Sequence, residues 1–257
     1  MTGIFGGIDI GNRSINAVLI DDHNIILSSY SKFTQENAII GAKHALNKAI
    51  ELSGKSFEDL KVIVATGVGK KWINFANKKS SEVVCQALGA SLLYPQEMTI
   101  VNIGAESYRA INVNERAVVT NYVENDKCAA GSGIFLEEMS SALGVDIEKA
   151  GEICFNSPRI EKISSFCAVF AESEVVSAIH RGIPIEELLA GVHEAIVERI
   201  ASIVRRVKPN KEIVLTGGLA NNICLKKMLQ EKLDITIIVP ENPTVVGALG
   251  AAIQAKR

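Results

Sequence analysis

The 257-residue chain has few aromatic residues, no long apolar run and almost no net charge, and each absence excludes a class of protein. Aromatic residues make up only 5% while hydrophobic residues make up 47%, so the core must be mostly aliphatic, as in α/β proteins with buried parallel strands. No stretch approaches the roughly 20 apolar residues of a membrane span. The net charge of −2 provides no basic field for nucleic acid or for a membrane surface. A small molecule or another protein is therefore the expected partner.

The five cysteines are scattered, and the chain does not begin like a secreted protein. Its first residues lack the charged segment and the cleavage site of a signal peptide, so we expect a cytoplasmic location. In that reducing compartment an odd number of cysteines does not suggest a disulfide framework. Cofactor ligands and buried thiols are the alternatives. Cys85, Cys154 and Cys224 lie on apolar helical faces, where we expect small buried hydrophobic side chains.

One unit of strands and turns occurs twice in the chain. Residues 7–29 and residues 100–122 each contain short apolar runs, and each unit begins with a hydrophobic-Asp/Asn-hydrophobic-Gly step. This pattern predicts a meander of three strands in each half. Helices are expected after both units, because apolar residues recur there every three or four positions. These expected helices are residues 37–52, 81–92, 133–143 and 185–207. A further helix is expected to begin within residues 172–180, after Cys167.

The duplication predicts an α/β protein of two lobes with a cleft between them. The N-terminal lobe is residues 1–95 and the C-terminal lobe is residues 96–242. No flexible linker separates the two, so we expect them to be packed and hinged. Strands at 213–215 and 236–239 complete the second lobe. A C-terminal helix within residues 243–257 is expected to pack back onto the first lobe.

The turn DIGNRS, which begins at Asp9, has the residue types of a phosphate-binding site. Gly11 permits close approach of the backbone, and successive N–H groups with the Ser14 hydroxyl can donate to phosphate oxygens. The Asp9 carboxylate suits a magnesium ion held through water molecules. Arg13, beside Asn12, can add positive charge at the phosphates. An ordinary hairpin with a surface Asp is the alternative interpretation of this turn taken alone.

A further glycine turn, TGG, follows the apolar strand 213–215. Gly217 and Gly218 can admit a flat adenine or ribose close to the backbone, and Asn221 is another candidate for binding the nucleotide. Taken alone, such a turn is more often simple punctuation between a strand and a helix.

The combination of turns is more specific than any one of them. A strand-Asp-x-Gly turn, its repeat one lobe later and a late TGG turn resemble the actin, sugar-kinase and heat-shock ATPase superfamily. The resemblance implies duplicated ribonuclease-H-like domains. It also implies ATP bound in the cleft between the lobes, with its phosphates between the two repeated turns.

Two cysteines each precede an expected helix. Cys128 stands in the sequence NDKCAAGSG and Cys167 in the sequence SSFCAVFAESEV. The unpaired N–H groups and the dipole of a helix N-terminus stabilise a thiolate and any anionic cluster bound to it. Two thiolates are half of the ligands that a cubane cluster requires, and a symmetric dimer would supply the other half.

These cysteine segments make a family recognisable. Together with ATGVG at residues 65–69, SEVVC at 81–85 and TGG at 216–218, they resemble the BadF/BadG/BcrA/BcrD-type ATPases, which include activators of 2-hydroxyacyl-CoA dehydratases and benzoyl-CoA reductase ATPase subunits. The resemblance runs nearly end to end. It implies a homodimer with one shared 4Fe–4S cluster bound by Cys128 and Cys167, and it implies ATP and Mg²⁺ as further ligands. It also implies an ATP-driven conformational change and transfer of a low-potential electron from ferredoxin or flavodoxin to an iron–sulfur dehydratase or reductase.

The second phosphate turn departs from the family pattern. The family usually has DIGGQD, whereas this chain has NIGAES, beginning at Asn102. Gly104 and Ala105 remain candidates for binding phosphate, but Asn102 cannot act as a base or balance the charge of magnesium as Asp would. Glu106 brings a negative charge close to the γ-phosphate. With Asp9 it is our candidate for catalysis, because a carboxylate can orient or deprotonate the attacking water.

Two other functions stay open at this point. One is a small-molecule kinase of the same superfamily, which would give the cysteines no role. The other is a non-hydrolysing, nucleotide-sensing subunit of a reductase, and the altered second turn supports it.

Overall fold

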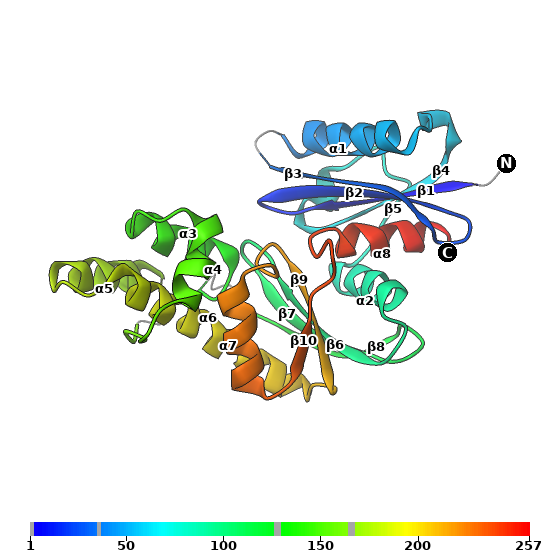
Figure 1. Ribbon diagram of the computed structural model, residues 1–257. Helices are drawn as coiled ribbons and strands as arrows, with labels where there is room; N and C mark the ends of the chain where they lie inside the picture. Colours follow the sequence, from blue (N-terminus) through cyan, green and yellow to red (C-terminus); the bar gives the residue numbers. More distant parts are fainter. Residues whose placement is uncertain (1–2, 35–36, 126–129, 164–167) are drawn as a thin grey trace. The chain divides into compact units, whose positions relative to one another are not determined.

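The computed structural model describes residues 3–34, 37–125, 130–163 and 168–257 (Figure 1). The chain is an α/β protein with two mixed five-stranded sheets. It divides into two compact units, and each is described by itself. One unit comprises Met1–Ile100, Ile111–Asn121 and Pro240–Arg257, and the other comprises Val101–Ala110 and Tyr122–Val239. The division that the sequence places after residue 95 stays a prediction.

The first sheet has the strand order β3-β2-β1-β4-β5. Its first three strands form the antiparallel meander expected for residues 7–29, while β4 pairs in parallel with β1 and β5 pairs in parallel with β4. The register sets Asp9 opposite Asn16 on one side and opposite Thr66 on the other. The strands are β1 (Ile4–Ile10), β2 (Ser14–Asp21), β3 (Ile26–Phe33), β4 (Leu60–Thr66) and β5 (Lys78–Lys79).

Helices cover both faces of the first sheet (Figure 1). On one face, Ile8, Ile10 and Ile15 pack with the apolar side of α1 (Ala38–Ser53). On the other face, Phe5 and Val18 pack with α8 (Val246–Ala255) and with the buried thiol of α2 (Glu82–Leu93). Side chains of a strand alternate between the two faces, which is why consecutive positions contribute to different clusters. Two short 3₁₀ helices, η1 (Phe57–Asp59) and η2 (Val68–Trp72), flank β4.

Glycines let α8 approach both α2 and the sheet at backbone distance. A Cβ on Gly250 would collide with the Cys85 carbonyl of α2, and one on Gly89 would collide with the Val246 carbonyl of α8. A Cβ on Gly7 of β1 would meet the backbone of α8 in the same way. The small residues at these positions are therefore required by close packing.

The second sheet has the strand order β10-β9-β6-β7-β8. β9 and β10 pair in parallel. The strands are β6 (Met98–Ile103), β7 (Tyr108–Val113), β8 (Val119–Glu124), β9 (Glu212–Gly217) and β10 (Thr236–Ile238). The helices that follow in this part of the chain are α3 (Gly133–Ala142), α4 (Ile147–Phe155), α5 (Ala168–His180), α6 (Ile185–Val207) and α7 (Ile223–Leu233).

The largest apolar cluster of this second part forms around α6. Buried residues recur along the helix at helical spacing, for example Leu189, Ile196, Ile200 and Val204. Acidic residues occupy its first turn and arginines its last turn, which is the favourable arrangement for the helix dipole. Although α6 is 23 residues long, none of the described helices combines the length and the apolar content that crossing a bilayer requires.

The helices expected from apolar spacing are confirmed, and α6 has the expected bounds of 185–207. The elements that were not predicted from the sequence include β4 and α4. β4 lies inside the first sheet and needs no alternation of apolar and polar residues, while α4 is too short for a clear period.

One expectation about the cysteines is wrong. Cys154 of α4 and Cys224 of α7 form a disulfide, with their Cα atoms 5.9 Å apart, rather than two separate apolar thiols. The two residues are 70 positions apart in the chain, and only the packing of α4 against α7 brings them together. Cys85 is a free thiol and fully buried, as expected.

Candidate functional site

Each of the two repeated turns is closed by a backbone hydrogen bond between equivalent residues. In the first turn the amide of Gly11 donates to the carbonyl of Ser14 at 2.8 Å. In the second the amide of Gly104 donates to the carbonyl of Ser107 at 2.7 Å. The duplication expected from the sequence is therefore present at the level of individual atoms.

Thr34, just after β3, holds the backbone of the first turn. It donates its amide to the Arg13 carbonyl at 2.9 Å and its hydroxyl to the Gly11 carbonyl at 3.3 Å. The side chains of Asn12 and Arg13 are exposed, and that of Ser14 is half-buried at the start of β2. The turn can therefore present its polar groups to a ligand without changing its backbone.

The carboxylate of Asp9 lies in a cradle of two glycines. A Cβ on Gly247, in α8, would collide with Oδ2 of Asp9, and a Cβ on Gly67, at the end of β4, would meet Oδ1. Gly67 also has φ of +86°, a conformation that favours glycine. Neither glycine was predicted from the sequence to have a role. The signals that could have found them are the ATGVG segment and the small-residue C-terminal helix.

The thiol of Cys85 is close to this cradle but is not a reactive group. Burial raises the pKa of Cys85, hydrogen bonds with Ser80 and Thr66 lower it, and the charge of Asp9 raises it further. A neutral, buried thiol is a poor nucleophile, which agrees with the packing role expected from the sequence.

The second turn is bound to the N-terminus of α3. The amides of Gly133 and Ile134 donate to the carbonyls of Gly104 and Ala105, at 2.9 and 2.8 Å. From the sequence, the first amides of this helix were expected to face a thiolate. Two of them donate to the carbonyls of the second glycine turn, because α3 packs directly against its backbone.

The third turn lies beside the second. Gly217 has φ of +93°, and a Cβ on it would collide with the carbonyl of Ile103. A Cβ on the exposed Gly218 would meet no atom, so one face of this turn is open. The amide of Ala220 donates to the Gly217 carbonyl at 3.2 Å, and Asn221 is exposed. Close backbone approach is thus built into the TGG turn.

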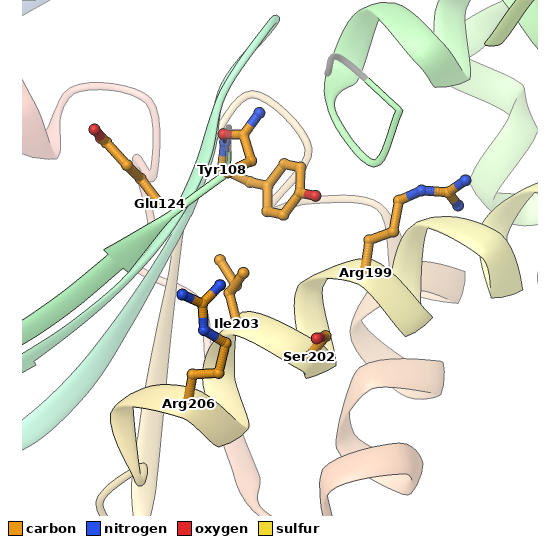
Figure 2. A pocket seen from close by; sticks show the side chains of 7 residues that line it. Tyr108, Glu124, Arg199, Ser202, Ile203 and Arg206 are labelled. Atoms are coloured by element: carbon orange, nitrogen blue, oxygen red, sulfur yellow. Dashed lines mark hydrogen bonds between the residues drawn. The ribbon is translucent and has the colours of Figure 1, made fainter. Parts of the chain in front are cut away.

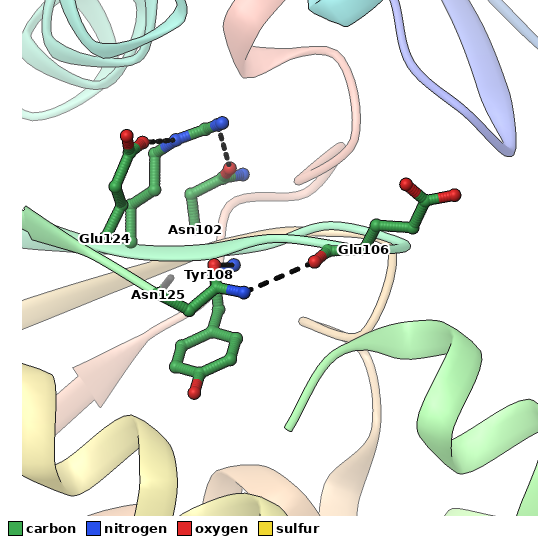
Figure 3. A network of polar contacts seen from close by, with 6 residues as sticks. Asn102, Glu106, Tyr108, Glu124 and Asn125 are labelled. Atoms are coloured by element: carbon green, nitrogen blue, oxygen red, sulfur yellow. Dashed lines mark hydrogen bonds and ion pairs between the residues drawn. The ribbon is translucent and has the colours of Figure 1, made fainter. Parts of the chain in front are cut away.

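A row of polar side chains crosses four neighbouring strands of the second sheet, and Figure 3 shows the part that runs from Asn102 to Glu124. Nδ2 of Asn102 on β6 donates to the hydroxyl of Thr216 on β9 at 3.2 Å. Oδ1 of Asn102 accepts from Arg109 on β7 at 3.5 Å, and Arg109 is paired with Glu124 on β8 at 3.0 Å. Arg109 is only 7% exposed, so its charge requires the carboxylate beside it. Asn102 therefore has a structural partner at each end of its amide.

Comparison with known proteins identifies the family. The profile of the BadF/BadG/BcrA/BcrD ATPase family matches residues 7–255. The chain belongs to this family. It is 34% identical to the 2-hydroxyisocaproyl-CoA dehydratase activator of Clostridioides difficile, over 97% of this chain and 93% of the relative. It is 36% identical to the activator of lactoyl-CoA dehydratase of Anaerotignum propionicum, over 97% and 96%, and 31% identical to a benzoyl-CoA reductase subunit of Thauera aromatica, over 97% and 92%.

Solved structures of the family have the same fold. Component A of the (R)-2-hydroxyglutaryl-CoA dehydratase of Acidaminococcus fermentans superposes with a TM-score of 0.94 at 32% identity. The superposition covers 99% of this chain and 98% of that one. The Clostridium difficile activator with bound ADPNP superposes with a TM-score of 0.92 at 34% identity, covering 100% and 94%. A Streptomyces griseus glucokinase, at 12% identity and a TM-score of 0.61, shares the fold alone. This family member thus has the two-lobed α/β fold of actin, sugar kinases and heat-shock ATPases.

The two cysteines that suggested the family by resemblance, Cys128 and Cys167, lie outside the described residues. Within the described ranges, no group of three or more His, Cys, Asp or Glu side chains is placed to hold a metal ion. The cluster expected from the resemblance therefore stays a prediction.

The structure brings the second and third turns together, since Asn102 donates to the hydroxyl of Thr216 and a Cβ on Gly217 would collide with the Ile103 carbonyl. The first turn, with Asp9 and Gly11, belongs to the other compact unit and is described by itself. The side chain of Glu106 is exposed and points away from Asn102 and Asn125, while its carbonyl faces Asn125 (Figure 3). A catalytic role for Glu106 stays a prediction.

A buried histidine supports the end of the third turn. His193 of α6 is 0% exposed, and its ring lies between the Leu189 carbonyl, 2.8 Å from Nδ1, and the Asn222 amide, 3.0 Å from Nε2. Asn222 in turn caps α7 by accepting from the amide of Leu225 at 3.0 Å. Burial lowers the pKa of His193, and these two hydrogen bonds oppose that shift. This residue was not selected from the sequence, where the only signal is one histidine within an apolar helical face.

A small cavity of about 190 Å³ lies between α6 and the adjoining ends of β7 and β8 (Figure 2). The phenol ring of Tyr108 points across it toward α6. The guanidinium of Arg199 stacks on Phe135, 5.7 Å from the ring centroid. The cavity is lined by Tyr108, Glu124, Asn125, Arg199, Ser202, Ile203 and Arg206. It therefore adjoins the strand end that precedes Cys128.

Proposed function

We propose that this chain is an ATP-dependent reductive activator. It binds and hydrolyses ATP, and it couples that cycle to the transfer of a low-potential electron to a partner metalloenzyme. The partner is a 2-hydroxyacyl-CoA dehydratase, an aromatic-CoA reductase or a related double-cubane cluster reductase. The observation that carries the proposal is the repeated Gly11 and Gly104 turn in a chain that matches dehydratase activators over almost its whole length.

The described residues suit a nucleotide with magnesium. In the first turn, the backbone at Gly11 and the Ser14 hydroxyl would bind phosphate oxygens, and Arg13 would offset their charge. The Asp9 carboxylate, fixed between two glycines, is a hard oxygen donor of the kind that Mg²⁺ prefers, directly or through water. The open face at Gly218 leaves room for the adenine or the ribose.

Hydrolysis needs one group that orients the attacking water. We assign this role to Glu106, whose exposed carboxylate belongs to the second phosphate turn. A water molecule bound to Glu106 would lose its proton to that carboxylate as it attacks the γ-phosphorus. The bond from this phosphorus to the bridging oxygen would break, and ADP and phosphate would leave. Asp9 would hold the magnesium ion that offsets their charge.

Cys128 and Cys167 would hold a 4Fe–4S cluster shared by two copies of the chain. Two thiolates from each copy complete the four ligands, so binding the cluster and forming the homodimer are one event. When bound, the cluster supplies a one-electron carrier that ferredoxin or flavodoxin loads.

Two measurements test the proposal. Isolated protein should turn over ATP. Asp9→Asn should lower kcat about a hundredfold, because an amide binds magnesium more weakly than a carboxylate and the phosphates would then lose their alignment. The matched control is Asp146→Asn, at a helix N-cap without a side-chain hydrogen bond, which should leave kcat unchanged. Anaerobically reconstituted protein should contain about four irons per dimer and give an EPR signal after reduction. A lower iron content, or iron that survives Cys128→Ala with Cys167→Ala, would overturn the shared cluster.

A non-hydrolysing, nucleotide-sensing subunit is the second candidate. It is favoured by Asn102, whose amide is engaged by Arg109 and Thr216. Measured ATP turnover by the isolated chain would exclude it. A small-molecule kinase of the same fold would keep full activity in the double cysteine variant.

A further inference from the structure

One phosphate turn binds the chain on both sides of residues 126–129. The carbonyl oxygens of Gly104, Ala105 and Glu106 are consecutive, and each accepts a hydrogen bond from a residue near that stretch. The donors are, in the same order, the Gly133 amide at 2.9 Å, the Ile134 amide at 2.8 Å and Nδ2 of Asn125 at 3.3 Å. The stretch that contains Cys128 thus starts and ends at the same turn.

Asn125 joins Tyr108, which follows the turn, to Glu106 within it. Its amide donates to the Tyr108 carbonyl at 3.0 Å, and its Oδ1 accepts from the Tyr108 amide at 2.8 Å. Its Nδ2 then reaches the Glu106 carbonyl on the far side of the turn (Figure 3). Only a side chain with both a donor and an acceptor can make the last two bonds together, and an aspartate could make only the bond from Tyr108.

The peptide planes of the turn relate these carbonyls to the phosphate site. In a trans peptide the C=O and the following N–H point in opposite directions, and none of the described peptide bonds is cis. With the carbonyls of residues 104–106 directed at Asn125 and α3, the amides of residues 105–107 face the opposite way. A phosphate that rotates these planes must also move the three carbonyls.

We infer that Asn125 is a positioning residue that transmits occupancy of the second phosphate turn to the segment carrying Cys128. The inference rests on the proposed function, since it takes the amides of this turn as ligands for phosphate. Gly133 and Ile134 make the equivalent link on the far side of the segment, but through backbone amides, which every substitution except proline leaves in place. Asn125 is the link that a side-chain change can break.

Cluster-free protein provides the test, with the reactivity of Cys128 as the readout. The rate at which N-ethylmaleimide modifies Cys128 is measured by peptide mass spectrometry, with and without Mg²⁺ and ADPNP. Nucleotide affinity is measured on the same samples. In the unchanged protein the nucleotide should alter the rate about fivefold or more, a common size for coupling between two sites. In Asn125→Ala the ratio should fall below about twofold with affinity nearly unchanged.

Two further variants separate positioning from folding. Asn125→Asp keeps the bond from the Tyr108 amide but loses the donor to Glu106, and it should lose the response as well. Asn121→Ala, an exposed change on the same strand, should keep it. A full response in Asn125→Ala or in Asn125→Asp, or no response in a protein that binds ADPNP, would overturn the inference and leave the proposed function intact. Absence of nucleotide binding in the unchanged protein would overturn the proposed function itself.

Discussion

Gly247→Ala tests whether the glycine cradle fixes the Asp9 carboxylate for catalysis. The added methyl would collide with Oδ2 of Asp9 and would lie 3.0 Å from Nε2 of Gln86. Both neighbours are the ends of side chains, so they can move aside. The substitution should therefore displace the carboxylate without disturbing the backbone of α8.

The expected magnitude follows from that displacement. Restoring an ordinary contact requires the carboxylate to shift by about 1 Å, and a misplacement of this size costs about a hundredfold in rate. Alanine also favours the helix over glycine by about 1 kcal/mol, which offsets the crowding. Gly247→Ala should thus lower kcat about a hundredfold while the free energy of unfolding changes by less than about 1 kcal/mol.

Steady-state ATP turnover at saturating Mg²⁺ and urea unfolding measure the two effects. Gly250→Ala on the same helix is the matched control, because its methyl would meet the Cys85 backbone, which cannot move aside. That variant should lose about 1–3 kcal/mol of stability from overpacking and keep the kcat of the folded protein. Unchanged kcat and KM in Gly247→Ala would show that the position of Asp9 does not limit catalysis, and the reasoning would fail.

Two further predictions concern stability. Reducing the Cys154–Cys224 disulfide, which closes a loop of 70 residues, should lower the free energy of unfolding by about 4 kcal/mol in the loop-entropy model. Urea unfolding with and without a thiol reductant measures this loss. The control variant Cys85→Ala should show the same difference between oxidised and reduced protein. Equal unfolding midpoints would mean that Cys154 and Cys224 are both thiols in the native protein. Because burial lowers the pKa of His193 below 6.5, the unfolded chain binds its proton more tightly. Stability should therefore be complete above pH 6.5 and fall as the pH drops through that value, and His193→Gln should remove this part of the dependence; a pH profile identical in both proteins would contradict it.

Local patterns predicted the elements that carry the candidate site. The glycine turns at Gly11 and Gly104 were expected from a repeated motif, because a tight turn between strands depends on a few adjacent residues. The bounds of α6 were expected from apolar spacing along one helical face. In each of these cases the signal and the structure involve the same short segment.

The features that could not be predicted all join distant segments. The sequence shows Gly247 as one small residue among several in the C-terminal helix, and only the fold sets it against Asp9. The Cys154–Cys224 pair depends on how α4 packs against α7. An asparagine such as Asn125 is equally suited to a plain turn, so its bonds to the phosphate turn cannot be read from its type.

The second turn has a neutral side chain, Asn102, at its buried position and a carboxylate, Glu106, at its exposed position. An aspartate at position 102 would place a second carboxylate beside Arg109, which already pairs with Glu124. The amide of Asn102 accepts from Arg109 and donates to Thr216 without adding a charge beside the ion pair of the buried Arg109 with the exposed Glu124. The remaining carboxylate of the turn is Glu106, at the exposed position. A charge placed there is solvated, whereas a carboxylate at the buried position 102 would be desolvated and would depend on a cation beside it. With Asn at position 102, Glu106 is the one carboxylate of this turn.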